Sequence, residues 1–170
     1  MPARLIAAAL LGLALVPAAA SARPVRDVDL PALLAQEIAQ ARTRTLVPIL
    51  LPQALPSDFR RHFADGRADA AGWRFDIGAV RGCGAASACF IARFRGRHAG
   101  RPTNRRALRL ARGRTGWFRP LRCGASCSPP SLQWRERRTL FTIRAKVGTQ
   151  ATERSLLVRM ANSAIRNGPR

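Results

Sequence analysis

The sequence predicts an α+β fold, in which an antiparallel sheet of about six or seven strands is packed on one face by an N-terminal and a C-terminal helix. Two observations predict it. Several short runs alternate apolar and polar residues, as strands with one buried face do. Apolar residues also recur at helical spacing before the first of these runs and after the last. Strands accompanied by flanking helices are typical of α+β domains, and the clean alternation predicts that the second face of the sheet meets solvent.

Residues 1–22 have the features of a secretory signal peptide. Arg4 gives a positive start, Leu5 to Val16 are uniformly apolar, and Ala20-Ser21-Ala22 is a small-residue cleavage site. The apolar run is shorter than the roughly 20 residues that a membrane-spanning helix needs. We therefore expect cleavage near Ala22, a single α+β domain over residues 23–170 without a transmembrane segment, and a periplasmic or extracellular location.

The first part of this domain is predicted to contain one helix and one edge strand. Residues 23–29 are expected to be a loose leader that ends at Asp29, a suitable cap for a helix from Leu30 to Arg42. The prolines within Leu46–Pro52 favour a short edge strand there. Residues 53–72 are predicted to be loop.

The alternating runs predict the remaining strands at residues 73–79, 90–95, 108–110, 117–121, 132–134 and 141–147. Their large aromatic residues are expected to form the core against the C-terminal helix: Trp73, Phe90, Phe94, Trp117, Trp134 and Phe141. That helix is predicted from Thr152 to Asn167, because an apolar stripe runs along it and Gly168-Pro169 follows it.

Four cysteines in an exported chain predict two disulfides, from the set Cys83, Cys89, Cys123 and Cys127. Three pairings are possible, and we favour the two local ones. A Cys83–Cys89 bridge would contribute about 2 kcal/mol in the chain-entropy treatment. A copper site at the second pair is the alternative, but both histidines lie far upstream, so no metal and no cofactor are predicted.

The charge is the strongest compositional feature. The net charge is +21, from 30 basic residues, all arginine except Lys146, against nine acidic ones. GC-rich codons would explain arginine in place of lysine but not the scarcity of acidic residues. A cationic surface attracts anionic polymers. The predicted partners are therefore an anionic envelope polymer, such as lipopolysaccharide or an acidic glycan, or nucleic acid; the oligomeric state stays open.

If the alternating runs are strands, many of the basic residues share the face away from the core. Arginine binds phosphate and carboxylate groups bidentately. Together with a basic loop at residues 97–106, this face gives the predicted anion-binding set: Arg74, Arg93, Arg95, Arg97, Arg101, Arg105, Arg106, Arg109, Arg144 and Lys146. The alternative is that these are solvated charges on an open sheet. No aromatic residue is expected among them, so stacking on nucleic-acid bases is not predicted.

A catalytic role is not predicted. The acid–histidine cluster consists of Asp58, His62, Asp65 and Asp69, which read most simply as a solubilising loop. A hydrolase would need an activated nucleophile and an oriented base, and nothing marks Ser57 as that nucleophile. A hydrolase therefore stays a distant alternative. A carrier that holds a small apolar ligand between the sheet and the C-terminal helix is the nearer one.

Several segments resemble a group of uncharacterised secreted bacterial proteins. These segments are Leu46–Pro52, the Cys83/Cys89 turn, Gly116 with its aromatic neighbours, Cys123–Pro130, Trp134 and Ala161–Ile165. The resemblance spans roughly residue 46 to the C-terminus, and its Cys-Ser-Pro-Pro and Ala-Asn-Ser-Ala-Ile pieces are the most specific. It implies an exported protein with an antiparallel sheet backed by helices, and it implies no catalytic residue. The arginine excess departs from the group's pattern.

Overall fold

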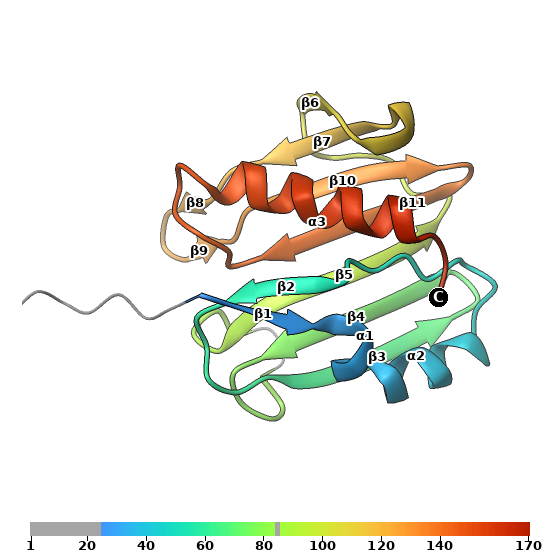
Figure 1. Cartoon of the computed structure of the whole chain (residues 1–170), viewed down its shortest axis with the longest axis horizontal. Helices are drawn as coiled ribbons and strands as arrows, with labels where there is room; N and C mark the ends of the chain where they lie inside the picture. Colours follow the sequence, from blue (N-terminus) through green and yellow to red (C-terminus); the bar gives the residue numbers. More distant parts are fainter. Residues whose placement is uncertain (1–24, 84–85) are drawn as a thin grey trace, which may run out of the picture.

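The computed structural model describes residues 25–83 and 86–170 (Figure 1). Among these residues, seven strands form one antiparallel sheet in the order β3-β4-β5-β11-β10-β7-β6, accompanied by three α-helices. The chain is thus mixed α+β, as its alternation predicts. The predicted signal peptide lies outside the described residues.

The elements are β1 (Arg26–Asp29), α1 (Leu30–Leu33), α2 (Ala35–Arg42), β2 (Ala54–Ser57), β3 (Phe63–Asp69), β4 (Gly72–Gly78), β5 (Phe90–His98), β6 (Arg106–Arg109), η1 (Ala111–Gly113), β7 (Thr115–Arg119), β8 (Arg122–Cys123), β9 (Cys127–Ser128), β10 (Ser131–Glu136), β11 (Thr139–Ala145) and α3 (Glu153–Asn167).

Helix α3 lies over β10 and β11 on one face of the sheet (Figure 1). Its buried stripe consists of Leu157, Met160, Ala161, Ala164 and Ile165, each at most 2% exposed. These positions recur at helical spacing, which is why the sequence predicts this helix correctly. Gly168 ends the helix with a φ of 75°, a conformation that glycine adopts without strain.

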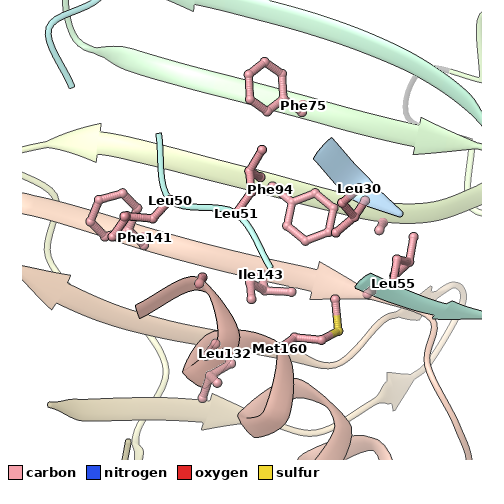
Figure 2. Packing of buried hydrophobic residues seen from close by; sticks show 14 of the residues in the cluster. Leu30, Leu50, Leu51, Leu55, Phe75, Phe94, Leu132, Phe141, Ile143 and Met160 are labelled. Carbon is pink, nitrogen blue, oxygen red and sulfur yellow. The ribbon is translucent and has the colours of Figure 1, made fainter. Parts of the chain in front are cut away.

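The core lies between the sheet and the elements on that face (Figure 2). Phe75, Phe94 and Phe141 come from three neighbouring strands and are at most 1% exposed. Trp134 stacks on Phe141 with ring centroids 5.4 Å apart. Leu30 of α1 is fully buried in the same cluster. The inward residues of the alternating runs therefore supply most of the apolar burial, which is the main favourable term in folding.

The N-terminal segment differs from the prediction in two ways. The predicted helix from Leu30 to Arg42 is interrupted at Leu34, where φ and ψ are −103° and 14°, so that α1 and α2 are separate. Asp29 caps α1 as expected, because its carboxylate accepts a hydrogen bond of 3.1 Å from the backbone N–H of Ala32. Residues 26–29, however, form strand β1, which pairs with β2, so the predicted loose leader is wrong there.

The predicted edge strand at Leu46–Pro52 is wrong as well. This segment pairs with no strand in the described part of the chain. Its residues Ile49, Leu50 and Leu51 are buried, whereas Leu46 is fully exposed. A proline has no N–H to give to a sheet. Strand β3 supplies the seventh strand instead, from residues predicted to be loop.

Two aromatic residues predicted for the core lie on the opposite face. A β-bulge pairs Gly78 with Phe90 and Ile77 with Ala92, which shifts Phe90 to the face away from α3. On β7, Phe118 is the buried residue at 4% exposure, so its neighbour Trp117 points the other way and is half-buried. Because side chains alternate between faces, one shift of parity exchanges the two faces of a strand.

Residues 99–105 cross that second face to connect β5 with the far edge strand β6. The carboxamide oxygen of Gln133 accepts hydrogen bonds from the backbone N–H groups of Thr103, at 2.8 Å, and Asn104, at 3.0 Å. The amide nitrogen of Asn104 donates to the backbone carbonyls of Trp117 and Ser131, at 3.0 and 3.2 Å, and to the Ser131 hydroxyl at 3.1 Å. These buried contacts fix the crossing segment on the sheet.

The disulfides join Cys83 to Cys89 and Cys123 to Cys127, which are the two local pairings. The first closes the turn between β4 and β5, and the second joins β8 to β9. Over residues 25–83 and 86–170, no helix is both long and apolar enough to cross a membrane.

Candidate anion-binding face

The face of the seven-stranded sheet opposite α3, here called the open face, carries arginines in direct cross-strand register. Arg74 of β4 lies opposite Arg95 of β5, and Arg93 of β5 lies opposite Arg144 of β11. Like charges directly opposite each other destabilise a sheet. By register and alternation, the arginines of the open face are Arg67, Arg74, Arg93, Arg95, Arg97, Arg109, Arg119, Arg135 and Arg144.

One carboxylate neutralises part of this charge. Asp76 receives the Nε of Arg74 at 3.0 Å on one oxygen and the Nε of Arg93 on the other. A single carboxylate is thus shared between two guanidinium groups, and a net positive charge remains. The open-face carboxylates of β3, Asp65 and Asp69, form no ion pair within the described residues.

Arg95 lies close to three other arginines of the open face. Burial, followed by the neighbouring guanidinium groups of Arg97, Arg74 and Arg93, lowers the pKa of Arg95, and Asp69 opposes the shift. Arginine nevertheless stays charged at any physiological pH. The direction of the shift shows that burial and the three neighbouring guanidinium groups outweigh the opposing effect of the Asp69 carboxylate on the pKa of Arg95.

Arg144 occupies a similar position one strand away. Its guanidinium carbon lies 5.6 Å from the centroid of the Phe90 ring, a cation–π contact. Burial, then Arg119 and Arg93, lowers the pKa of Arg144. The Nε atoms of Arg144 and Arg119 are buried and have no hydrogen-bond partner among the described residues.

Two cavities indent the open face, and Arg95 and Arg97 line both of them. The first, of about 360 Å³, lies over β3, β4 and β5 and is also lined by Arg67 and Arg74. The second, of about 210 Å³, lies between the sheet and the crossing segment, from which Arg101 contributes. Each cavity has room for a small anionic group such as a phosphate or a sugar carboxylate, and both present several guanidinium groups to it.

The predicted anion-binding residues are not all gathered on this face. Arg74, Arg93, Arg95, Arg97 and Arg144 lie together, while Arg109 lies farther off, on the edge strand. Arg101 and Arg105 belong to the crossing segment and are exposed.

The other two predicted residues are placed differently. Arg106 lies opposite the core residue Phe118 and so takes the α3 side of β6. Lys146 donates to the backbone carbonyl of Ser87 in the disulfide-closed turn, which occupies its charged end.

Arg67 and Arg119 also belong to the open face, although the sequence analysis does not select them. Arg67 lies in β3, whose inward residues Ala64, Gly66 and Ala68 are too small to mark an alternation. Arg119 lies two residues after Trp117 and therefore shares its face of β7. Because the sequence analysis assigns Trp117 to the core, it also assigns Arg119 to the core side and does not select it. Treating Phe118 as the inward residue would have identified Arg119.

Asp58, His62, Asp65 and Asp69, interpreted from the sequence as a solubilising loop, form no ion pair with one another within the described residues. Instead, the Nε2 atom of His62 lies 2.9 Å from the hydroxyl of Ser57, which also accepts a hydrogen bond of 3.2 Å from the backbone N–H of Phe59. Burial lowers the pKa of His62, which favours the neutral imidazole that can accept the hydroxyl proton. Ser57 is 4% exposed, and the pair borders a surface cavity of about 600 Å³.

Within the described ranges, no group of three or more His, Cys, Asp or Glu residues is arranged to hold a metal ion. No protein-family model matches the chain, and the comparisons with curated proteins and with solved structures each gave no significant match.

Proposed function

We propose that this chain is an exported, non-catalytic protein whose open face binds an anionic polymer of the cell envelope. The observation that carries the proposal is the register that sets Arg74 against Arg95 and Arg93 against Arg144. Like charges in register lower stability, and a bound polyanion offsets that cost. Of the envelope polymers, lipopolysaccharide and acidic glycans carry the phosphate and carboxylate groups that guanidinium groups bind best.

A periplasmic or extracellular location is part of the proposal. The bridges Cys83–Cys89 and Cys123–Cys127 fit an oxidising compartment, and residues 1–22 have the features of an export signal. The open face can be the binding surface only if the opposite, apolar face of the sheet is covered by other elements of the chain. Helix α3 closes its β10–β11 half, and we propose that the N-terminal helical segment, with Leu30 and Leu34 buried, closes the rest.

Titration of the protein with lipopolysaccharide and with duplex DNA, followed by tryptophan fluorescence at low and high salt, tests the proposal. We expect binding of lipopolysaccharide that weakens steeply as salt rises, because contacts to a polyanion release counterions. Preference for DNA would redirect the proposal to nucleic acid. Absence of binding at low salt would refute it.

A matched pair of triple variants tests the face itself. Arg67→Glu, Arg95→Glu and Arg97→Glu reverse the exposed arginines around the larger cavity, and we expect this variant to lose binding. The control variant reverses the same number of exposed arginines away from that face, at Arg122, Arg154 and Arg159. Equal loss in both variants would mean that net charge, and not this face, accounts for binding.

A hydrolase is the second candidate, and the contact between Ser57 and His62 favours it. A serine hydroxyl beside a neutral histidine is the beginning of an activated nucleophile, although no carboxylate in the described part of the chain orients the imidazole. Hydrolysis of p-nitrophenyl acetate that disappears in both Ser57→Ala and His62→Ala would establish this activity. Unchanged hydrolysis in either variant would exclude the pair.

A further inference from the structure

The cavity of about 210 Å³ between the sheet and the crossing segment has two chemically different sides. Its floor includes one cross-strand row, in which Arg95 of β5 lies opposite Thr142 of β11 and Thr142 lies opposite Gln133 of β10. In the next row of the same face, Arg97 lies opposite Leu140. The β5 side of the floor thus presents guanidinium groups, whereas the β11–β10 side presents a hydroxyl, a carboxamide and an apolar side chain.

The carboxamide of Gln133 is held in one orientation. Gln133 is 8% exposed, and its oxygen accepts hydrogen bonds from the backbone N–H groups of Thr103, at 2.8 Å, and Asn104, at 3.0 Å, and from the Thr103 hydroxyl at 3.3 Å. The opposite orientation would place the NH₂ group of the carboxamide against these donors. The nitrogen itself has no hydrogen-bond partner among the described residues, so it is a fixed donor that Gln133 presents to the cavity.

The remaining polar side chains that line this cavity are not engaged by other parts of the protein. Within residues 25–83 and 86–170, the Thr142 hydroxyl makes no side-chain hydrogen bond. No ion pair in those ranges involves Arg95, Arg97 or Arg101, the arginine that the crossing segment contributes. The cavity therefore combines positive charge that no carboxylate neutralises with neutral donors that the protein does not use. A ligand that carries both an acid group and hydroxyl groups can engage all of them.

A sugar acid fits both sides of the cavity. Its carboxylate accepts two parallel hydrogen bonds from one guanidinium group. Its hydroxyls can pair with the Gln133 amide and the Thr142 hydroxyl, and the carbon face of its ring can pack on Leu140. The volume of about 210 Å³ is several times the roughly 30 Å³ that one water molecule takes up in the liquid, which leaves room for a whole sugar ring. A lone phosphate would leave the neutral side unused.

We propose that this cavity is a subsite for one acidic sugar of a glycan, such as a hexuronate, and we call it the sugar-acid subsite. This inference rests on the proposed function and identifies an acidic glycan as the polymer that the open face selects. The cross-strand row continues beyond the subsite, because Arg95 lies opposite Arg74 and Arg74 lies opposite Arg67, and these three arginines line the larger cavity. A glycan seated by one sugar can therefore extend across the strands to further arginines.

Trigalacturonate, a short glycan of acidic sugars, tests the subsite against two comparison ligands at equal ionic strength. Its methyl ester keeps the sugar rings without the charge, and inorganic triphosphate supplies charge without a ring. Calorimetric titration should give an affinity for trigalacturonate at least about tenfold above that for the ester, because the ester loses the charge-assisted hydrogen bonds. Equal affinity for the acid and the ester would overturn the inference.

NMR of the side-chain amides locates the bound glycan. We expect trigalacturonate, and not triphosphate, to shift the signals of the Gln133 NH₂ group. Gln150, exposed beyond the end of β11, is the internal control and should not respond. Equal shifts of the Gln133 signals with both ligands, or no shift with trigalacturonate, would overturn the inference.

Two variants with matched controls test the two sides of the subsite. Thr142→Val keeps the shape and removes the hydroxyl, so the affinity for trigalacturonate should fall about two- to tenfold while that for triphosphate stays unchanged. Thr115→Val, on the same sheet face in β7, should change neither affinity. Arg101→Gln should lower the affinity for trigalacturonate about ten- to a hundredfold. Arg159→Gln removes the same charge from the exposed side of α3 and should have little effect, because salt screens distant charges.

Wild-type affinity for trigalacturonate in Thr142→Val, or equal losses in Arg101→Gln and Arg159→Gln, would overturn the sugar-acid subsite. The proposed function can fail separately. Salt-sensitive binding of lipopolysaccharide by a wild-type protein that does not bind trigalacturonate refutes the subsite and leaves polymer binding intact. A wild-type protein that binds neither lipopolysaccharide, DNA nor trigalacturonate at low salt refutes the proposed function itself.

Discussion

Replacing Asn104 by alanine should loosen the segment that crosses the open face. The side-chain amide of Asn104 is 6% exposed and donates to three acceptors, of which two belong to Ser131 and one to Trp117. Replacement by alanine removes the donor and leaves its buried acceptors unpaired, because water has little access to this position. Leaving a buried polar group unpaired costs about 1–3 kcal/mol, so we expect a loss of about 2 kcal/mol in the free energy of unfolding. For a domain of this size that corresponds to a fall in Tm of about 4–8 °C.

Thermal and urea unfolding, followed by circular dichroism, measure the effect. Thr103→Ala is the control, because Thr103 is exposed and its backbone N–H still reaches Gln133. We expect that variant to stay within about 0.5 kcal/mol of wild type. If Asn104→Ala unfolds with the same midpoint as Thr103→Ala, the amide does not hold the crossing segment, and the reasoning from its three contacts is refuted.

Three further predictions concern stability. Gly96→Ala should cost about 1–3 kcal/mol in urea unfolding, because the new Cβ would lie 2.5 Å from the Trp73 Nε1 atom; an unchanged midpoint would mean that the ring moves freely. Burial lowers the pKa of His62, so below the ordinary histidine pKa of 6.5 the unfolded chain binds more protons than the folded one, and the free energy of unfolding should fall as the pH drops. His62→Gln should remove this part of the pH dependence. An unaltered dependence of stability on pH in that variant would contradict the assignment to His62. Joint replacement of Cys83 and Cys89 by alanine should lower stability by about 2 kcal/mol without reducing anion binding, since their bridge closes a short loop; intact stability would contradict the loop-closure argument.

The parts of the fold with large inward residues were predictable. Strands β4 and β11 and helix α3 carry strong apolar periodicity, and their bounds agree closely with the prediction. Strand β3 was not predictable in this way, because Ala64, Gly66 and Ala68 on its inner face bury little apolar area. Strands β1 and β2 are four residues each and pair across a long separation, so no local pattern announces them.

The arginine face was predictable from alternation wherever the parity of a strand was correct. Arg93, Arg95 and Arg144 follow from their alternation with buried residues. Arg119 was missed through a parity error at Trp117, and the bulge that turns Phe90 outward has no signal in a local apolar pattern. The cross-strand pairs Arg74–Arg95 and Arg93–Arg144 also depend on which strands are neighbours, which the order of strands along the chain does not fix.

Under the proposed function, the pairing of β5 with β11 makes anion binding dependent on the complete assembly of the sheet. Every other pairing in the large sheet joins strands that lie near each other in sequence, whereas β5 and β11 are separated by residues 99–138. Contacts between distant residues form slowly, because the intervening chain must close first. Arg93 belongs to one half of the sheet and Arg144 to the other, so the two arginines face each other only once β5 and β11 have paired. Under the proposed function, a polyanion bound across Arg93 and Arg144 would shift the equilibrium toward the joined sheet by mass action, so stability would rise with the concentration of the polyanion.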